Sequence, residues 1–173
     1  MRLDRVEEQL VGHRRIAVAE LYDVISRSAT LGPVPAETYL NGIAGSLRSS
    51  LLGEGPGVSI VVTAEPVSIR TEHAVTLGLI VNELATNAVK YAFPDGKGRI
   101  EIGFRRQEDG VTLTVSDDGI GLSAPGAGNA SSGLGSRFVE AFVRQLGGTM
   151  ATAAGSPGTT FTVRLPLSIF AEP

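Results

Sequence analysis

Residues 82–93 read NELATNAVKYAF, and they decide the fold because they close a long amphipathic run. The run starts at Thr71 or Glu72 and continues to about Ala92, where the turn sequence at 93–96 stops it. Its apolar residues recur at helical spacing, which predicts a long helix whose inner face is held against a sheet. The residues of that inner face are Leu77, Val81, Leu84 and Ala88.

A second face of the same helix carries polar groups suited to a nucleotide. Glu83, Asn87 and Lys90 share this face because they are spaced by four and three residues. The amide oxygen can ligate Mg²⁺, the carboxylate can orient a metal-bound water or the attacking group, and the ammonium can offset phosphate charge. A solvated helix face with an ion pair is the alternative interpretation, and this helix alone leaves both open.

The pattern on either side of this helix predicts a sheet. A strand is expected at 58–62, and two strand pairs follow the helix, at 99–105 with 111–116 and at 149–153 with 159–165. Short turns within each pair imply antiparallel pairing. With a further helix at 133–146, the order predicts an α+β fold, a two-layer sandwich of a mixed sheet with helices on one face.

The N-terminal part reads as helical. Residues 3–27 carry apolar residues every seven positions, at Leu3, Leu10, Ala17 and Val24, which is typical of a bundle seam. A glycine–proline run ends this helix, and a second helix is expected at 36–52. The sequence therefore predicts a helical segment over residues 1–55 and a separate domain over residues 56–170.

The sequence DDGIG at residues 117–121 directly follows a predicted strand. Asp117 at the strand end can accept a hydrogen bond from an exocyclic amine such as that of adenine. Gly119 and Gly121 let the backbone approach a flat ring. A tight turn built from ordinary turn residues is the alternative.

Two further motifs are weaker by themselves. Gly133, Leu134 and Gly135 open a predicted helix, whose free N–H groups and dipole attract phosphate, and the small-residue stretch before it would form a lid. Thr159, at the start of the last strand, could contact phosphate or fix Asp117. Threonine is also a good strand former, so a structural role is the alternative.

Composition excludes several classes of protein. The 173 residues carry a net charge of −3, which gives no electrostatic basis for nucleic-acid binding, and no cysteine, which excludes thiolate catalysis and zinc–thiolate sites. The sequence contains no P-loop motif, and its nearest dinucleotide-binding match, at 133–138, ends in phenylalanine. Without an apolar run of membrane-spanning length or a signal peptide, we expect a cytoplasmic protein.

The order of the four motifs resembles a known superfamily. Residues 82–93 look like the N box of histidine kinases, 117–122 like their first glycine box, 132–135 like the second, and 158–161 like the closing glycine–threonine motif. Together they resemble the gyrase, Hsp90, histidine kinase and MutL superfamily, which implies a Bergerat-type sandwich. The Asn-Glu-Leu opening and Tyr-Ala-Phe ending of the N box are similar to the second HisKA-type branch of histidine kinases, relatives of the HWE kinases.

This resemblance implies ATP and Mg²⁺ as cofactors and gives each motif a role. Asn87 would ligate Mg²⁺, Glu83 would assist phosphoryl transfer as the catalytic residue, Lys90 would meet phosphate, and Asp117 would bind the adenine amine. The resemblance assigns further residues to the nucleotide site, namely Tyr91, Gly119, Gly121, Gly133, Leu134, Gly135 and Thr159.

The implied activity is that of the catalytic core of a two-component sensor histidine kinase. It would pass the γ-phosphoryl group of ATP to a histidine, for relay to the receiver domain of a response regulator. Residues 15–22 resemble the second helix of that branch's dimerisation bundle, although Ala19 stands where histidine is usual, and a homodimer through this helix is an expectation. The phosphoaccepting histidine is not clearly present, because His13 lies near the apolar seam. The alternatives are an anti-sigma-factor serine kinase of the same superfamily and a degenerate scaffold that does not bind ATP.

Overall fold

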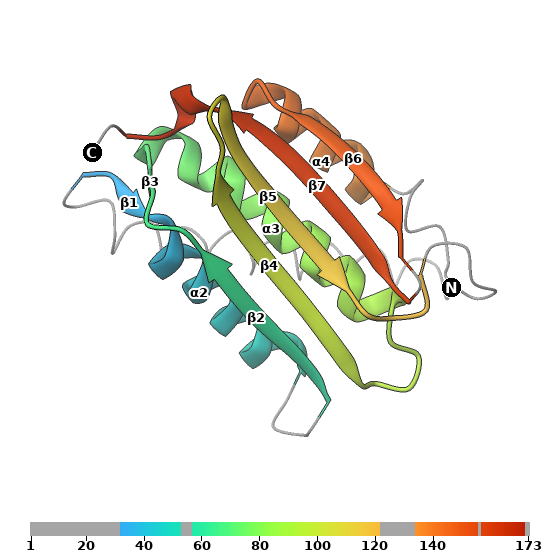
Figure 1. Ribbon diagram of the computed structural model, residues 1–173. Coiled ribbons are helices and arrows are strands. Elements are labelled where there is room, and N and C mark those ends of the chain that lie inside the picture. Colours follow the sequence, from blue (N-terminus) through green and yellow to red (C-terminus); the bar gives the residue numbers. More distant parts are fainter. Residues whose placement is uncertain (1–31, 53–56, 122–133, 156, 172–173) are drawn as a thin grey trace, which may run out of the picture.

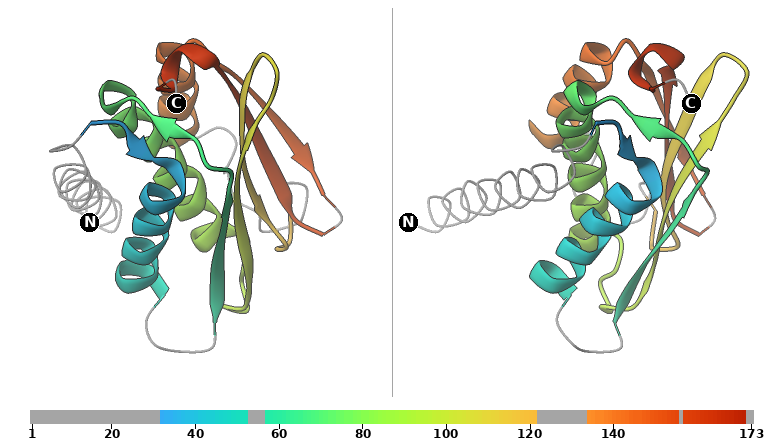
Figure 2. Two further views of the ribbon diagram at one scale, coloured as in Figure 1. Left: turned by 60° about the vertical axis from the view of Figure 1, so that its left-hand side comes forward. Right: turned by 90° about the vertical axis from the view of Figure 1, so that its left-hand side faces the viewer.

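The computed structural model describes residues 32–52, 57–121, 134–155 and 157–171. These residues form two layers, a five-stranded sheet and a layer of helices that covers one face of it (Figures 1 and 2). The predicted α+β sandwich with helices on one face is therefore confirmed. The expected helix at 3–27 and the small-residue stretch before residue 133 lie outside the described residues.

The sheet is mixed, as predicted. Its strands lie in the order β2-β4-β5-β7-β6, in which β2 pairs with β4 in parallel and the other neighbours are antiparallel. A parallel pair needs a long crossover, and the chain between β2 and β4 supplies it with the long helix α3 (Thr71–Tyr91). The strands are β2 (Val58–Ala64), β4 (Gly98–Arg106), β5 (Gly110–Asp117), β6 (Thr149–Ala154) and β7 (Thr159–Pro166).

The helices match the predicted positions, with one change of geometry. They are α2 (Ala36–Leu47), α3 (Thr71–Tyr91) and α4 (Leu134–Gln145). The single helix expected at 36–52 continues beyond α2 as a π-helical turn, Arg48–Leu52. Two serine hydroxyls in this turn donate to backbone carbonyls four residues earlier, a bond that competes with regular helical geometry. The Arg48 guanidinium also donates to the Ile60 carbonyl oxygen at 2.6 Å, which covers part of the edge of β2.

A second, two-stranded sheet was not predicted. It pairs β1 (Val34–Pro35) with β3 (Ser68–Ile69), and the C-terminal segment joins it through a bridge between Ile69 and Phe170. A short 3-10 turn, Leu167–Ile169, precedes that bridge. Strands of two residues are too short to show a periodicity in the sequence, so only long-range pairing reveals them.

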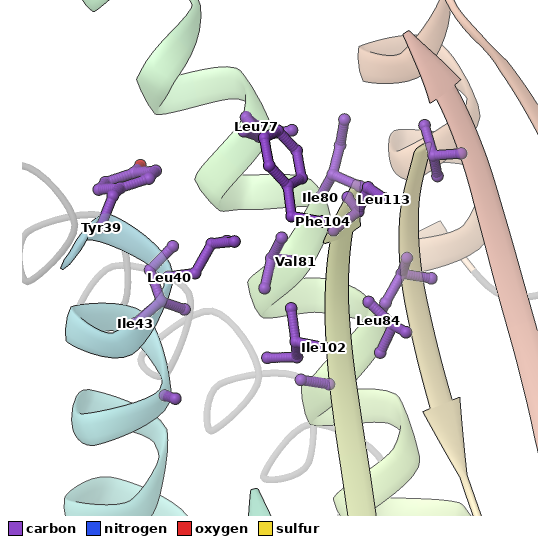
Figure 3. Close-up of a cluster of buried hydrophobic side chains, with 14 of the residues drawn as sticks. Tyr39, Leu40, Ile43, Leu77, Ile80, Val81, Leu84, Ile102, Phe104 and Leu113 are labelled. Carbon is purple, nitrogen blue, oxygen red and sulfur yellow. The ribbon is translucent and has the colours of Figure 1, made fainter. Parts of the chain in front are cut away.

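The core lies between the helices and the sheet. Leu77, Val81, Leu84 and Ala88, predicted as the inner face of α3, are all buried. Figure 3 shows side chains of α2, including Tyr39, Leu40 and Ile43, in the same cluster as the α3 and sheet residues. Because α2 contributes to this core, it packs as one unit with the rest. The division of the chain near residue 55 stays a prediction.

Tyr39 supplies a test of this packing. Its side chain is 0% exposed, and its hydroxyl donates to the Ala74 carbonyl oxygen at 2.6 Å. Burial raises the pKa of Tyr39 well above its ordinary value of about 10. The folded protein therefore keeps this proton at pH values where the unfolded chain releases it, so the stability that Tyr39 contributes is complete below about pH 10 and falls as the pH rises above it.

We expect Tyr39→Phe to lower the free energy of unfolding by about 1 kcal/mol near pH 8, through loss of the buried hydrogen bond. The difference between wild type and variant should shrink above about pH 10, because only the wild type loses this contribution there. Urea unfolding followed by circular dichroism at several pH values measures both effects. A difference that stays constant up to about pH 11 would contradict the burial argument.

Candidate functional site

The polar face of α3 lies beside its buried stripe, as the spacing predicted. Glu83 and Asn87 are partly buried, and Lys90 is exposed at the last turn of the helix. Tyr91, the last residue of α3, is 42% exposed. A carboxylate, an amide and an ammonium thus lie along the C-terminal half of the helix.

The loop at 117–121 packs against the end of this helix. The Ile120 amide donates to the Ala92 carbonyl oxygen at 2.9 Å. The last carbonyl groups of a helix have no amide partner within the helix, and here the loop supplies one. A Cβ atom on Gly119 would overlap Ala92, so only glycine permits this approach. These contacts bring the strand end that carries Asp117 to the same end of α3 as Asn87 and Lys90.

The start of β7 forms the other side of the loop. Thr159, 5% exposed, is the register partner of Asp117 across the β5–β7 pair. Gly158 has a φ of 92°, and a Cβ atom there would overlap the Asp117 carbonyl oxygen. Gly121, with a φ of 75°, lies next to Gly158, where its Cβ would be 3.1 Å from the Gly158 carbonyl oxygen. The three motifs that the sequence separates by many residues therefore meet at one place.

Asp117 is a partly buried carboxyl group at the end of β5, with a hydrogen bond from the loop that follows it. Its Oδ1 atom accepts a hydrogen bond from the Gly119 amide at 3.0 Å. Partial burial raises the pKa of the Asp117 carboxyl, and the neighbouring Asp118 adds to that rise, while backbone hydrogen bonds from Gly119 and Thr159 oppose it. Burial has the largest influence, so the net direction is upward.

Sequence reasoning did not single out the groups that support this loop. The Ala92 carbonyl, the Asp118 carboxylate and the tight packing at Gly98 hold it in place. A Cβ atom on Gly98 would overlap the Phe93 ring. The sequence offers only a faint signal for these supports, a glycine at the start of a strand that follows a turn.

The predicted phosphate-binding helix is α4, which begins at Leu134, with the partly buried Gly135 as its second residue. The backbone N–H groups of its first turn have no partner within the helix, which suits a phosphate. Gly133 lies outside the described residues. Within its described range the helix packs against α3, and Val139 and Val143 are among its buried residues.

The donor set fits Mg²⁺ bound through phosphate better than a metal held by protein alone. In the described parts of the chain, no group of three or more His, Cys, Asp or Glu residues is arranged to hold a metal ion. Mg²⁺ commonly takes one or two protein ligands and completes its shell with water and phosphate oxygens. The Asn87 amide and the Glu83 carboxylate on one face of α3 agree with that mode of binding.

A cavity of about 780 Å³ lies elsewhere, at the N-terminal end of α3, between the small sheet and the C-terminal segment. Its walls include Arg70, Thr71, Arg106 and Leu167, none of which belongs to the predicted motifs. We place the candidate site at the other end of α3, because the convergent polar groups and close-packed glycines lie there. None of the helices in the described residues is long and apolar enough to cross a membrane.

Comparison with known proteins shows the family to which the chain belongs. The sequence profile described as "Histidine kinase-, DNA gyrase B-, and HSP90-like ATPase" matches residues 72–169, more than half of the chain. Blue-light-activated histidine kinase 2 of Erythrobacter litoralis (strain HTCC2594) is 33% identical over 141 residues, which cover 78% of this chain and 39% of that protein. Blue-light-activated histidine kinase 1 of the same strain is 29% identical over 109 residues, 62% of this chain and 30% of that protein. The chain thus spans well under half the length of these curated relatives.

A solved structure shows the same fold. The histidine kinase domain from the Erythrobacter litoralis EL346 blue-light activated histidine kinase superimposes with a TM-score of 0.76 at 25% identity. The superposition covers 96% of this chain and 83% of that chain. The shared arrangement includes a mixed sheet with helices on one face.

Proposed function

Since the chain belongs to the family of histidine kinase-, DNA gyrase B-, and HSP90-like ATPases and is an ATP-binding core of the histidine-kinase type, we propose that it transfers the γ-phosphoryl group of ATP to a histidine. In the transfer a phosphorus–oxygen bond of ATP breaks, a phosphorus–nitrogen bond to the imidazole forms, and ADP leaves. The receiver domain of a response regulator would then accept the phosphoryl group. Two copies of the chain would associate through residues 3–27.

One observation carries the proposal, the packing of the loop at 117–121 on the end of α3. The hydrogen bond from Ile120 to Ala92 and the close approach of Gly119 hold the strand end that carries Asp117 at the same end of α3 as Asn87 and Lys90. A nucleotide needs one group that binds its base and another that binds its phosphates, because the base and the phosphates lie at opposite ends of one molecule. A simple turn after an edge strand would require neither contact.

Each polar residue has a role that follows from its chemistry. Asp117 accepts a hydrogen bond from the exocyclic amine of adenine, with its carboxylate oriented by Gly119. Asn87 would hold Mg²⁺ through its amide oxygen, and the bound ion would neutralise charge on the phosphate oxygens. Lys90 offsets phosphate charge, and Glu83 orients the attacking imidazole.

The remaining residues shape the pocket around the nucleotide. Glycines let the backbone lie against the base, and the first turn of α4 offers N–H groups to phosphate. Thr159, next to Asp117 in the sheet, supports the Asp117 carboxylate through its backbone amide. The residues assigned to these supporting roles are Tyr91, Gly119, Gly121, Gly133, Leu134, Gly135 and Thr159.

The accepting histidine is proposed to lie outside the described residues. His73 is in the first turn of α3, and Asn87 is in the last part of the same helix. At about 1.5 Å rise per residue, they are roughly 21 Å apart along the axis, so His73 cannot reach phosphate bound beside Asn87 in the same chain. A histidine on a dimerisation helix would have to approach this end of α3.

Isothermal titration with a non-hydrolysable ATP analogue tests the proposal. We expect wild type to bind the analogue more tightly with Mg²⁺ than without it. Asn87→Ala should abolish most of the Mg²⁺-dependent gain, a change of roughly tenfold, while binding without Mg²⁺ changes little. The physical reason is that Asn87 acts on the ion and not on the base.

Asn41→Ala is a matched control, because Asn41 is an exposed amide on α2 whose side chain donates only to the Glu37 carbonyl oxygen. It should bind nucleotide as wild type does. A folded wild type that binds no ATP analogue would overturn the kinase proposal and favour a degenerate scaffold. An Asn87→Ala variant with an unchanged response to Mg²⁺ would remove only the metal role of Asn87.

A further inference from the structure

The end of the β4–β5 ladder has an unusual hydrogen-bond arrangement. The last register pair is Ile100 with Asp117, and Arg99 and Asp118 would form the next. The Asp118 amide donates to the Arg99 carbonyl oxygen at 3.2 Å, as a ladder requires. The Arg99 amide, however, donates to the Asp118 side-chain Oδ1 at 2.7 Å and not to its backbone carbonyl.

The use of a side-chain acceptor in place of a backbone acceptor sets the direction in which the chain leaves the sheet. In a regular antiparallel pair both bonds join backbone atoms, so the two strands continue side by side. Because the Asp118 carboxylate takes the place of its own carbonyl, Arg99 keeps its partner while the backbone after Asp118 turns away. The chain then passes through Gly119 to the end of α3.

The carboxylate of Asp118 also belongs to a tightly packed cluster. A Cβ atom on Gly98 would overlap the Phe93 ring and lie 2.9 Å from the Asp118 Oδ1 atom. Phe93, 8% exposed, therefore meets the loop over the bare backbone of Gly98. Three segments therefore meet at this point: the turn after α3, the start of β4 and the loop at 117–121.

We infer that Asp118 is a positioning residue of the nucleotide site, which fixes the loop at 117–121 so that the Asp117 carboxylate points at the base. The bond between Asp118 and Arg99 sets the direction in which the chain leaves the sheet. That direction places the Gly119 amide, which donates to the Asp117 Oδ1 atom at 3.0 Å. In this role Asp118 acts through Asp117, and the contacts that the structure gives its carboxylate are with the backbone at Gly98 and Arg99. The inference rests on the proposed function, because it assigns Asp117 to the adenine amine.

Three substitutions separate the position of the acceptor from its charge. Asp118→Asn keeps an oxygen at the same distance from the backbone and loses the charge. Asp118→Glu keeps the charge and moves the oxygen by one methylene, and Asp118→Ala removes both. We expect Asp118→Ala and Asp118→Glu to weaken binding of a non-hydrolysable ATP analogue roughly five- to tenfold, and Asp118→Asn to stay within about twofold of wild type.

A second nucleotide shows whether the effect passes through Asp117. The matching triphosphate of purine riboside lacks the exocyclic amine and so cannot use the Asp117 carboxylate. Asp118→Ala should change its affinity by less than about twofold, since one hydrogen bond is already missing. Asp109→Ala, which removes an exposed carboxylate from the turn between β4 and β5, is the control and should leave both affinities unchanged.

Amide hydrogen exchange gives a readout that needs no nucleotide. In Asp118→Ala the Arg99 and Gly119 amides should exchange roughly tenfold faster than in wild type, and Asp118→Asn should restore their protection. If wild type binds no ATP analogue, the kinase proposal fails, and the exchange rates still decide whether Asp118 holds the loop. Should Asp118→Ala not fold, the comparison of Asp118→Asn with Asp118→Glu carries the test.

Three results would overturn the inference. The first is equal weakening of both nucleotides by Asp118→Ala, which indicates general damage to the domain. The second is wild-type binding by Asp118→Glu together with weak binding by Asp118→Asn, which indicates that charge matters and position does not. The third is unchanged exchange of the Gly119 amide in Asp118→Ala.

Discussion

Asp117→Asn is expected to weaken binding of the ATP analogue by roughly ten- to a hundredfold while the protein stays folded. A hydrogen bond to a charged acceptor contributes about 1.5–3 kcal/mol, and the asparagine amide can present a donor to the adenine amine where a carboxylate presents only acceptors. Isothermal titration of wild type and variant under identical conditions measures the loss.

A measurement of stability distinguishes this loss of nucleotide binding from unfolding of the variant. Because burial raises the pKa of Asp117, the ionised carboxylate is less favourable in the folded protein than in the unfolded chain. The stability associated with its protonation is present at low pH and lost as the pH rises through the folded-state pKa. Near pH 7 the neutral asparagine avoids this cost, so Asp117→Asn should unfold at a urea concentration no lower than that of wild type.

The exposed carboxylate at Asp109 again supplies the matched control, since Asp109→Asn makes the same chemical change far from the loop. It should alter neither affinity nor stability. Full retention of ATP-analogue binding by Asp117→Asn would remove Asp117 from the adenine site. A parallel loss of binding and stability would mean that the residue acts on the fold.

Gly158→Ala is expected to destabilise the domain by about 3 kcal/mol or more. The residue has a φ of 92°, where an L side chain is strained, and its Cβ would overlap the Asp117 carbonyl oxygen. Backbone strain of this kind costs about 1–3 kcal/mol, and relieving the overlap requires β7 and the loop after β5 to separate. Urea unfolding followed by circular dichroism measures the change.

Gly96→Ala distinguishes strain from overlap. Gly96 also has a positive φ, 68°, but a Cβ atom there would meet nothing within 4 Å. Its substitution should therefore cost only the conformational strain, about 1 kcal/mol. If the two variants lose equal stability, the close approach of Gly158 to Asp117 is not a constraint on the fold.

The candidate site was predictable in its parts and not in its assembly. The spacing of Glu83, Asn87 and Lys90 indicates a shared helix face, because residues three and four apart lie on one side of any helix. The position of Asp117 at a strand end follows from the periodicity before it. No pattern in the sequence indicates that Ile120 donates to Ala92, because that bond joins residues from separate elements.

Some features of the fold escaped prediction for the same reason. The π-helical turn after α2 has the apolar spacing of a continuing helix, so the sequence predicts one helix where the structure has two geometries. The two-residue strands β1 and β3 exist only because they pair with each other and with the C-terminal segment. Neither could be recognised from local propensity.

By itself the sequence determined the positions of the three described α-helices and of the strands of the five-stranded sheet, which face of α3 is buried, and which residue types are available for a nucleotide. These follow from local periodicity and side-chain chemistry, which act over a few residues. Only the tertiary structure decided the parallel pairing of β2 with β4, the close approach of Gly121 to Gly158, and the hydrogen bond from the Arg99 amide to the Asp118 carboxylate. Such contacts join residues far apart in the chain, and they form only when burial of the common core brings their elements together.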